Sequence, residues 1–208
     1  MIQESIQIEY CKRLDAVKSL VPKGSRLLDI GTDHASLPID LVCSKKIKSA
    51  IASDVNSKPL MRAKEEIEKN GLSDKIKTVL SNGFENVDSD SFDCVAICGM
   101  GGHLIAEIIE DGKHKAKGCI LILQPMSYPE ALRKYLYENG FQILNEVFAF
   151  ENNKAYVIIL TKYTGNITNY TYIDLLFGNF MPKTPCYFKY EKKNQTETSK
   201  KTHWNFKT

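Results

Sequence analysis

Residues 26–38, RLLDIGTDHASLP, constrain the fold more than any other stretch of the chain. A short apolar run rises to Asp29, breaks at Gly31 into a polar loop at residues 32–34, and continues as a helix-compatible stretch from Ala35. This order predicts the strand, tight turn and helix start of a nucleotide-binding α/β unit, in which ligands bind at the carboxyl ends of parallel strands. We therefore expect a cofactor to lie over this turn.

The composition of the turn argues against one class of cofactor and favours another. A dinucleotide site needs the pattern G-x-G-x-x-G. Here only Gly31 occupies a glycine position, and Asp33 and His34 fill the space that a diphosphate would take. A carboxylate at Asp33 repels a pyrophosphate but suits S-adenosylmethionine (SAM), which carries an ammonium and a sulfonium and no phosphate. The alternative is a strand-to-helix turn in which Asp33 only caps the helix.

Length and composition predict one folded domain with at most a small addition. The chain has 208 residues, of which 43% are hydrophobic and 25% charged, as in ordinary globular proteins. We expect Cys43, Cys94, Cys98 and Cys119, which lie in apolar runs, to be buried hydrophobic residues in a reducing compartment rather than disulfides or metal ligands. No apolar run is long enough to span a bilayer, and the first ten residues do not resemble a signal peptide. The sequence thus predicts a cytoplasmic protein without a membrane or metal site.

The net charge of +3 is concentrated towards the C-terminus. Residues 151–208 hold nine lysines and four acidic residues, so residues 1–150 are slightly acidic. Such a patch marks either a face that meets a polyanion or a solubilising tail.

Hydrophobic periodicity predicts alternating strands and helices. The helices are expected at residues 8–21, 36–44, 57–70, 103–110 and 130–139, and the strands at 27–30, 49–55, 76–81, 92–98, 119–123, 141–151 and 154–163. Because helices separate the first five strands, this order predicts a doubly wound seven-stranded sheet. We expect the last two strands to pair antiparallel and the first helix to pack on a sheet edge.

Further ligand contacts are expected where other strands end. Asp54 ends the second strand about twenty residues after the glycine turn, where an acidic residue can accept hydrogen bonds from ribose hydroxyls. Asn82 and Gly83 follow the third strand, where an amide can contact adenine, although a plain turn is an equal alternative. Gly99, Met100, Gly101 and Gly102 follow the fourth strand, and three glycines in four residues imply close approach to a ligand or to neighbouring backbone.

Six blocks of the chain together resemble the TrmK family of bacterial tRNA (adenine-N1)-methyltransferases, which modify adenine 22 of tRNA. They are KRLDAVKSLVPKG, LLDIGTDHASLP, AIASDVN, CGMGGHLIAEIIEDG, LILQPMSYPEALRKYL and EVFAFENNKAYVIILTKY. The resemblance covers residues 12–163. It implies a Rossmann-like class I methyltransferase domain over residues 1–163, with the seventh strand beside the fifth. It also implies that residues 164–208 form a short basic extension, truncated relative to the helical arm with which the family helps to hold tRNA.

The resemblance and the strand-end positions together give a set of expected contacts. Those expected at SAM are Asp29, Gly31, Thr32, Asp33, His34, Asp54, Val55, Asn82, Gly83, Gly99, Met100 and Gly101. Those expected at the substrate are Gly102, Gln124, Pro125, Tyr128, Lys12 and Arg13. One departure concerns Met126, because the family usually has Asn at this position.

N1 of neutral adenine already carries a lone pair, so methylation needs no prior deprotonation and leaves a cationic product. Catalysis then depends on alignment and on a nearby negative group. The candidates for that group are Asp29 and Asp33, with His34 as an orienting group. The Gly-Met-Gly-Gly segment lacks the Asp/Asn-Pro-Pro-aromatic motif of enzymes that methylate exocyclic amines, and this favours a ring nitrogen.

Aromatic and basic side chains are the candidates for RNA contact. Tyr128 could stack on a flipped base or pack as a surface aromatic, and His103 could face a phosphate or simply begin a helix. The cations expected on RNA phosphates are Lys12, Arg13, Lys183, Lys189, Lys192 and Lys193.

Two other functions remain open from the sequence. One is SAM-dependent methylation of another RNA base or of a small molecule, and the other is a catalytically silent tRNA-binding module of the same fold. A nicotinamide-dependent oxidoreductase fits least, because the pyrophosphate glycines are missing. We expect a monomer or weak dimer.

Overall fold

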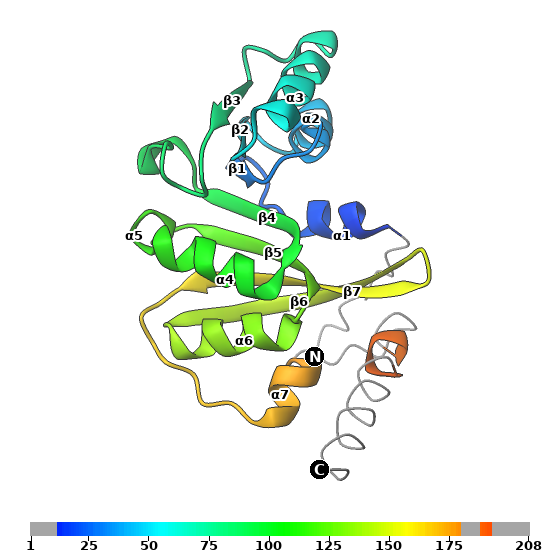
Figure 1. Cartoon of the computed structure of the whole chain (residues 1–208), viewed down its shortest axis with the longest axis vertical. Helices are drawn as coiled ribbons and strands as arrows, with labels where there is room; N and C mark the ends of the chain where they lie inside the picture. The colour runs from blue at the N-terminus through cyan, green and yellow to red at the C-terminus, as the bar shows by residue number, and fades with distance from the viewer. Residues whose placement is uncertain (1–11, 180–187, 193–208) are drawn as a thin grey trace, which may run out of the picture.

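The computed structural model describes residues 12–179 and 188–192. Its centre is a seven-stranded sheet of order β3-β2-β1-β4-β5-β7-β6 (Figure 1). The strands are β1 (Arg26–Ile30), β2 (Ser49–Asp54), β3 (Ile76–Leu80), β4 (Cys94–Gly101), β5 (Ile120–Ser127), β6 (Phe141–Glu151) and β7 (Lys154–Tyr163). β1 to β5 are parallel, and β7 runs antiparallel to both β5 and β6. The predicted doubly wound sheet, with its seventh strand beside the fifth, is confirmed.

Helices cover both faces of the sheet. They are α1 (Arg13–Leu20), α2 (Ser36–Cys43), α3 (Ser57–Lys69), α4 (Gly102–Asp111), α5 (Lys113–Ala116), α6 (Pro129–Glu138) and α7 (Tyr172–Phe177), with a 3₁₀ turn η1 (Ser89–Ser91). Because side chains alternate along a strand, Leu27 packs with α1 to α3 on one face and Leu28 packs with α4 to α6 on the other. α1 touches β5, β7 and β6, so it lies across this part of the sheet and is not confined to the edge as expected.

The ends of β4 and β5 differ from the prediction. Both strands were expected to stop before a turn, yet β4 continues through Gly101 and β5 through Ser127. The register between them shifts at Cys98/Met100 and again at Met100/Gly101. Gly99, at φ +81°, forms a β-bulge that absorbs the extra residue and lets pairing resume. The helix after β4 accordingly begins at Gly102.

The chain after β7 packs back onto the domain. α7 begins at a capping box between Thr171 and Asp174, and Tyr190 is buried with its ring 5.0 Å from that of Phe148. The apolar and aromatic side chains spaced along residues 170–190 predict either packing against the sheet or a short helix, and the described part has both. The last fifteen or so residues, whose polar composition predicts poor order, lie outside the described residues.

The described thiols are all free, but they differ in exposure. Cys94 and Cys119 are buried and Cys98 is half-buried, whereas Cys43 is exposed, because it ends α2 at the surface, contrary to the expectation. Burial raises the pKa of Cys94 to about 12, so this thiol is inert as a nucleophile. Over residues 12–179 and 188–192, no helix combines the length and the hydropathy that a membrane span requires.

Candidate active site

The turn between β1 and α2 is tied to β2 and is strained. The backbone N–H groups of Gly31 and Thr32 both donate to Ser53 O, at 2.8 and 2.9 Å. Gly31 has φ +77°. His34 and Ala35, three and four residues further on, have φ +56° and +51°. Left-handed backbone at a non-glycine residue costs about 1–2 kcal/mol, and such strain gathers at functional sites. Neither of these left-handed residues could be predicted from the sequence.

Asp29 is the one predicted catalytic group that lies buried in this turn. Burial raises the pKa of its carboxyl to about 6, against an opposing effect of the Thr32 side chain. Asp29 forms no ion pair with any described residue. The buried Thr32 hydroxyl is near enough to lower the pKa of Asp29, yet it forms no hydrogen bond of ordinary geometry with any residue in the described part of the chain. A buried acid without a cation and a hydroxyl without a partner fit a cationic ligand that also forms hydrogen bonds. The residues present therefore suit the methionine end of SAM.

Asp33 and His34 lie outside this buried turn. The Asp33 carboxylate is 3.4 Å from His34 Nε2 and 4.0 Å from Arg62 Nη1, and both predicted residues are exposed. Their predicted catalytic contacts remain a hypothesis. Asp29 is the stronger candidate for the negative group.

The tips of β2 and β3 form the adjoining part of the site. Asp54 accepts the Asn56 N–H at 2.7 Å, and this bond fixes its carboxylate at the end of β2. Val55 follows it and is 60% exposed, and Leu80, paired with Asp54 in the sheet register, is 54% exposed. Leu80 was not predicted. The signal that could have found it is an apolar residue that ends a strand at the edge where ligands bind.

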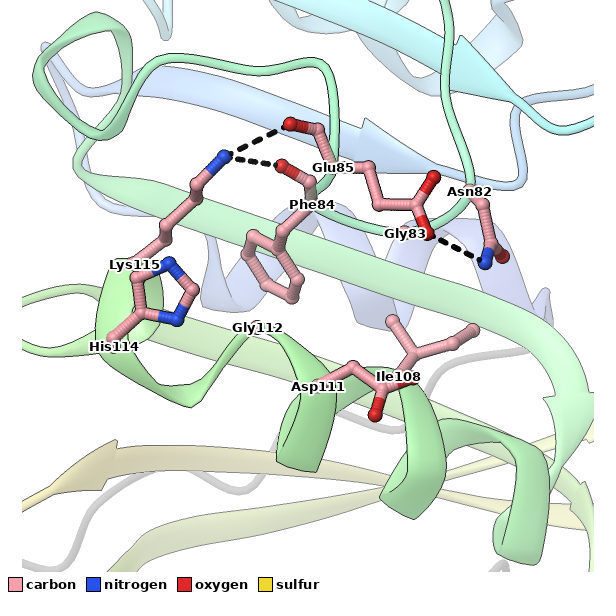
Figure 2. A pocket seen from close by; sticks show the side chains of 9 residues that line it. All are labelled: Asn82, Gly83, Phe84, Glu85, Ile108, Asp111, Gly112, His114 and Lys115. Atoms are coloured by element: carbon pink, nitrogen blue, oxygen red, sulfur yellow. Dashed lines mark hydrogen bonds between the residues drawn. The ribbon is translucent and has the colours of Figure 1, made fainter.

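The predicted adenine-side turn lines a real cavity. Asn82 and Gly83 belong to a hollow of about 250 Å³ that runs beneath the β3–β4 loop along α4 (Figure 2). Asn82 Nδ2 donates to Glu85 Oε1 at 3.2 Å, so its amide is partly engaged within the loop. A Cβ on Gly83 would lie 3.2 Å from Ile108 Cγ2 on α4. Glycine therefore suits this position because the turn packs closely against α4.

The glycines at the end of β4 bring backbone segments together. A Cβ on Gly31 would lie 2.0 Å from Met100 Cε, so the Met100 side chain covers the β1–α2 turn. A Cβ on Gly102 would lie 2.2 Å from Tyr128 O, so α4 starts directly against the loop after β5. Gly102 thus makes the predicted close approach to neighbouring backbone, whereas the SAM contacts expected of Gly99, Met100 and Gly101 stay a prediction.

Gln124 and Tyr128 occupy very different positions. Gln124 is fully buried, and its Oε1 accepts the Gly99 N–H at 3.1 Å while its Nε2 donates to Pro125 O at 2.9 Å. It therefore does not present its amide to a target base. Tyr128 is exposed at φ +53°, with its ring 5.1 Å from that of His103. This aromatic pair stands beside the end of β4.

Comparisons with known proteins fit this geometry. A family model described as "Methyltransferase domain" matches residues 10–159. The tRNA (adenine(22)-N(1))-methyltransferase of Bacillus subtilis is 35% identical over 182 residues, 85% of this chain and 76% of that protein. The solved structure of the B. subtilis M1A22 tRNA methyltransferase TrmK has a TM-score of 0.86 at 30% identity, covering 97% of this chain and 89% of that one. The chain belongs to the TrmK family. The structure of M. capricolum TrmK, in complex with the cofactor product S-adenosyl-homocysteine, has a TM-score of 0.79 at 33% identity, over 90% of this chain and 84% of that one.

The cations of this TrmK-family chain are distributed differently from the prediction. Arg13 was expected on RNA phosphate, yet its Nη1 donates to Gln124 Oε1 at 2.5 Å, inside the domain. Lys12 is exposed beside it. Lys189 Nζ lies 3.9 Å from the centre of the Phe150 ring, and Lys192 is exposed. The predicted contacts of Lys183 and Lys193 fall outside the described residues.

Proposed function

We propose that this protein transfers the methyl group of SAM to N1 of adenine 22 in tRNA. The observation that carries the proposal is the buried carboxylate of Asp29 near the end of β1 in a TrmK-family chain, which forms no ion pair with any residue that the structure describes. The B. subtilis relative is named for this reaction, and the M. capricolum relative holds the demethylated cofactor product.

The chain provides a place for each part of the cofactor. When bound, SAM supplies an electrophilic methyl group. Asp29 and Thr32 bind its amino-acid end, and Asp54 accepts hydrogen bonds from the ribose hydroxyls. The exposed side chains of Val55 and Leu80 contact the adenine, whose edge faces the Asn82–Gly83 turn.

The remaining residues align the target base. Because N1 of neutral adenine already has a lone pair, no residue has to remove a proton before transfer. The Asp29 carboxylate stabilises the positive charge that develops on the methylated ring. Tyr128, supported by His103, stacks on a base that has left the tRNA helix. Met126 is exposed beside them and offers an apolar contact where the family usually has Asn.

Cations around the site bind the tRNA backbone. Lys12 is exposed at the start of α1, Arg62 Nη1 lies 4.0 Å from Asp33 in the β1–α2 turn, and the described C-terminal lysines Lys189 and Lys192 are exposed. Such contacts set affinity and weaken with salt. A tRNA substrate and free thiols support a cytoplasmic location, and we propose a monomer or weak dimer as the active form.

The test is methylation of an unmodified tRNA transcript that has adenine at position 22, with a matched transcript that has guanine there. Nuclease digestion and mass spectrometry locate any added methyl group. We expect N1-methyladenosine at position 22 of the first transcript and no methylation of the second. Methylation elsewhere would favour another RNA base, and tRNA binding without any turnover would favour a silent binding module.

A further inference from the structure

The bulge in β4 leaves one backbone donor that the strand ladder does not use. Cys98 pairs with Gln124 and Met100 with Pro125, so Gly99 has no residue opposite it. Gly99 is an exposed residue, and its N–H, left out of the ladder, is free to bond to an acceptor outside the strand. The Gly99 N–H donates to the side chain of Gln124, at 3.1 Å from Oε1.

Arg13 reaches the same oxygen from α1. Its Nη1 donates to Gln124 Oε1 at 2.5 Å, and Gln124 Nε2 donates to Pro125 O, which fixes the direction in which the amide points. The guanidinium is held from its other side, since Arg13 Nε lies 3.9 Å from Glu151 Oε2. The Cζ atom of Arg13 lies 5.9 Å from the centre of the Tyr156 ring. Gln124 Oε1 thus accepts hydrogen bonds from both Arg13 on α1 and Gly99 in the bulge.

The bulge decides where Met100 points. Side chains alternate between the two faces of a strand, so removing one extra residue would turn every later side chain to the opposite face. With the bulge in place, the Met100 side chain lies over Gly31 in the turn that holds Asp29. The hydrogen bond that holds Gly99 therefore also holds the Met100 side chain beside the proposed site of methyl transfer.

We propose that Arg13 and Gln124 are positioning residues for methyl transfer, acting through the hydrogen bonds that hold the Gly99 bulge. The activity readout of this proposal rests on the proposed function. Methyl transfer requires nitrogen, methyl and sulfur in line, and a displacement of about 1 Å costs on the order of 100-fold in rate. Lys cannot replace Arg13, because an ammonium lacks the planar fork that reaches Gln124 and Glu151 together.

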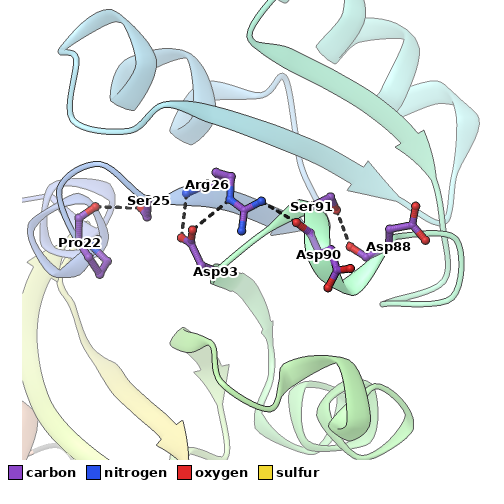
Figure 3. Close-up of polar contacts among 7 residues, drawn as sticks. All are labelled: Pro22, Ser25, Arg26, Asp88, Asp90, Ser91 and Asp93. Carbon is purple, nitrogen blue, oxygen red and sulfur yellow. Dashed lines mark hydrogen bonds and ion pairs between the residues drawn. The ribbon is translucent and has the colours of Figure 1, made fainter.

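The test compares Arg13→Lys with Arg26→Lys. Arg26 is a matched control because its guanidinium also binds a carboxylate and a carbonyl, Asp93 Oδ2 at 3.1 Å and Asp90 O at 2.5 Å (Figure 3). These contacts lie at the amino-terminal edge of the sheet, away from the site. We expect Arg13→Lys to lower kcat about 10- to 100-fold and to change KM for tRNA less than about threefold. Arg26→Lys should keep both within about twofold.

Two kinetic outcomes would overturn the proposal. If Arg13 only binds phosphate, Arg13→Lys, which keeps the positive charge, leaves kcat unchanged and changes KM for tRNA and its dependence on salt little. If Arg13 only supports the fold, the two variants lose thermal stability and activity alike.

Hydrogen exchange separates this proposal from the proposed function. The Gly99 amide should exchange at least about tenfold faster in Arg13→Lys than in Arg26→Lys, whether or not the wild type methylates tRNA. Equal exchange in the two variants would refute the role of Arg13. A wild type without methyl transfer, but with this difference in exchange, would refute only the proposed function.

Discussion

Asp29 couples the cofactor site to pH. Burial raises the pKa of its carboxyl from the ordinary 3.8 to about 6, because the charged form loses hydration. Between about pH 4 and 6 the folded protein therefore binds more protons than the unfolded chain, and its stability falls as pH rises through this window. A cation bound beside Asp29 favours the carboxylate and lowers its pKa again.

Two results follow for Asp29. SAM should bind more tightly as pH rises from 5 to 7, and binding at pH 6, where about half of the Asp29 carboxyls are protonated, should release about half a proton. Calorimetry in two buffers of different ionisation enthalpy measures both.

Asp29→Asn should remove this pH dependence and, since it removes a buried charge, raise the free energy of unfolding at pH 7.5 by about 2–3 kcal/mol. An unaltered pH profile in Asp29→Asn would show that another group titrates.

Asp54 should contribute to cofactor affinity through its held carboxylate. Asp54→Ala is expected to weaken SAM binding by about 1–3 kcal/mol, because two ribose hydroxyls lose a charged acceptor. Asp74→Ala is the control, since this exposed acid lies before β3 at the other edge of the sheet. Equal SAM affinities in the two variants, measured by calorimetry, would argue against the ribose contact.

Among single residues of the site, some positions could be predicted from the sequence and others could not, and the difference has physical reasons. Asp29 and Asp54 could be predicted, because the end of a parallel strand fixes the place of a residue. Arg13 could not, because its direction depends on Gln124, which is 111 residues away in the chain. Leu80 was missed although it ends the third strand, because its exposure depends on what the sheet edge leaves uncovered.

Among the elements, the junction of β4, α4 and the β5–α6 loop should be sensitive to one methyl group. In Gly102→Ala the new Cβ would lie 2.2 Å from Tyr128 O, so the loop that carries Tyr128 must move. We expect a loss of about 1–3 kcal/mol in stability and a larger loss in kcat than stability explains. Gly71→Ala is the control: its φ of +67° also costs about 1–2 kcal/mol, but nothing lies within 4 Å of the new Cβ. Thermal unfolding and kcat of both variants decide whether the loop position matters.

The elements themselves could largely be predicted, because hydrophobic period and helix-end signals agree along most of the chain. The errors lie where local signals mislead. Gly99 and Pro125 indicated strand ends, yet the bulge lets β4 and β5 pair beyond them. α5 and η1 were missed because one turn of helix carries no period to detect.

At the scale of the whole molecule, a buried ion pair joins the C-terminal segment to the domain. Arg133 on α6 and Glu146 on β6 are almost fully buried, with 2.7 Å between Arg133 Nε and Glu146 Oε1. Arg133 Nη1 also donates to Leu175 O at 2.8 Å and to the Tyr190 hydroxyl at 3.2 Å. The resemblance implies a separate extension from residue 164, and we propose instead that residues 164–179 and 188–192 dock as part of the domain.

Removing one partner of this pair should be more damaging than removing both. Arg133→Met leaves the Glu146 carboxylate buried and unpaired, so we expect a loss of about 3–5 kcal/mol in stability by urea denaturation. Arg133→Met with Glu146→Leu should recover most of that loss, because no buried charge remains. The double variant still lacks the bonds to Leu175 and Tyr190, so limited proteolysis should cut it after residue 163 faster than the wild type. If the double variant resists cleavage as well as the wild type, apolar packing such as the stacked rings of Tyr137 and Tyr170, 5.5 Å apart, holds the segment without Arg133.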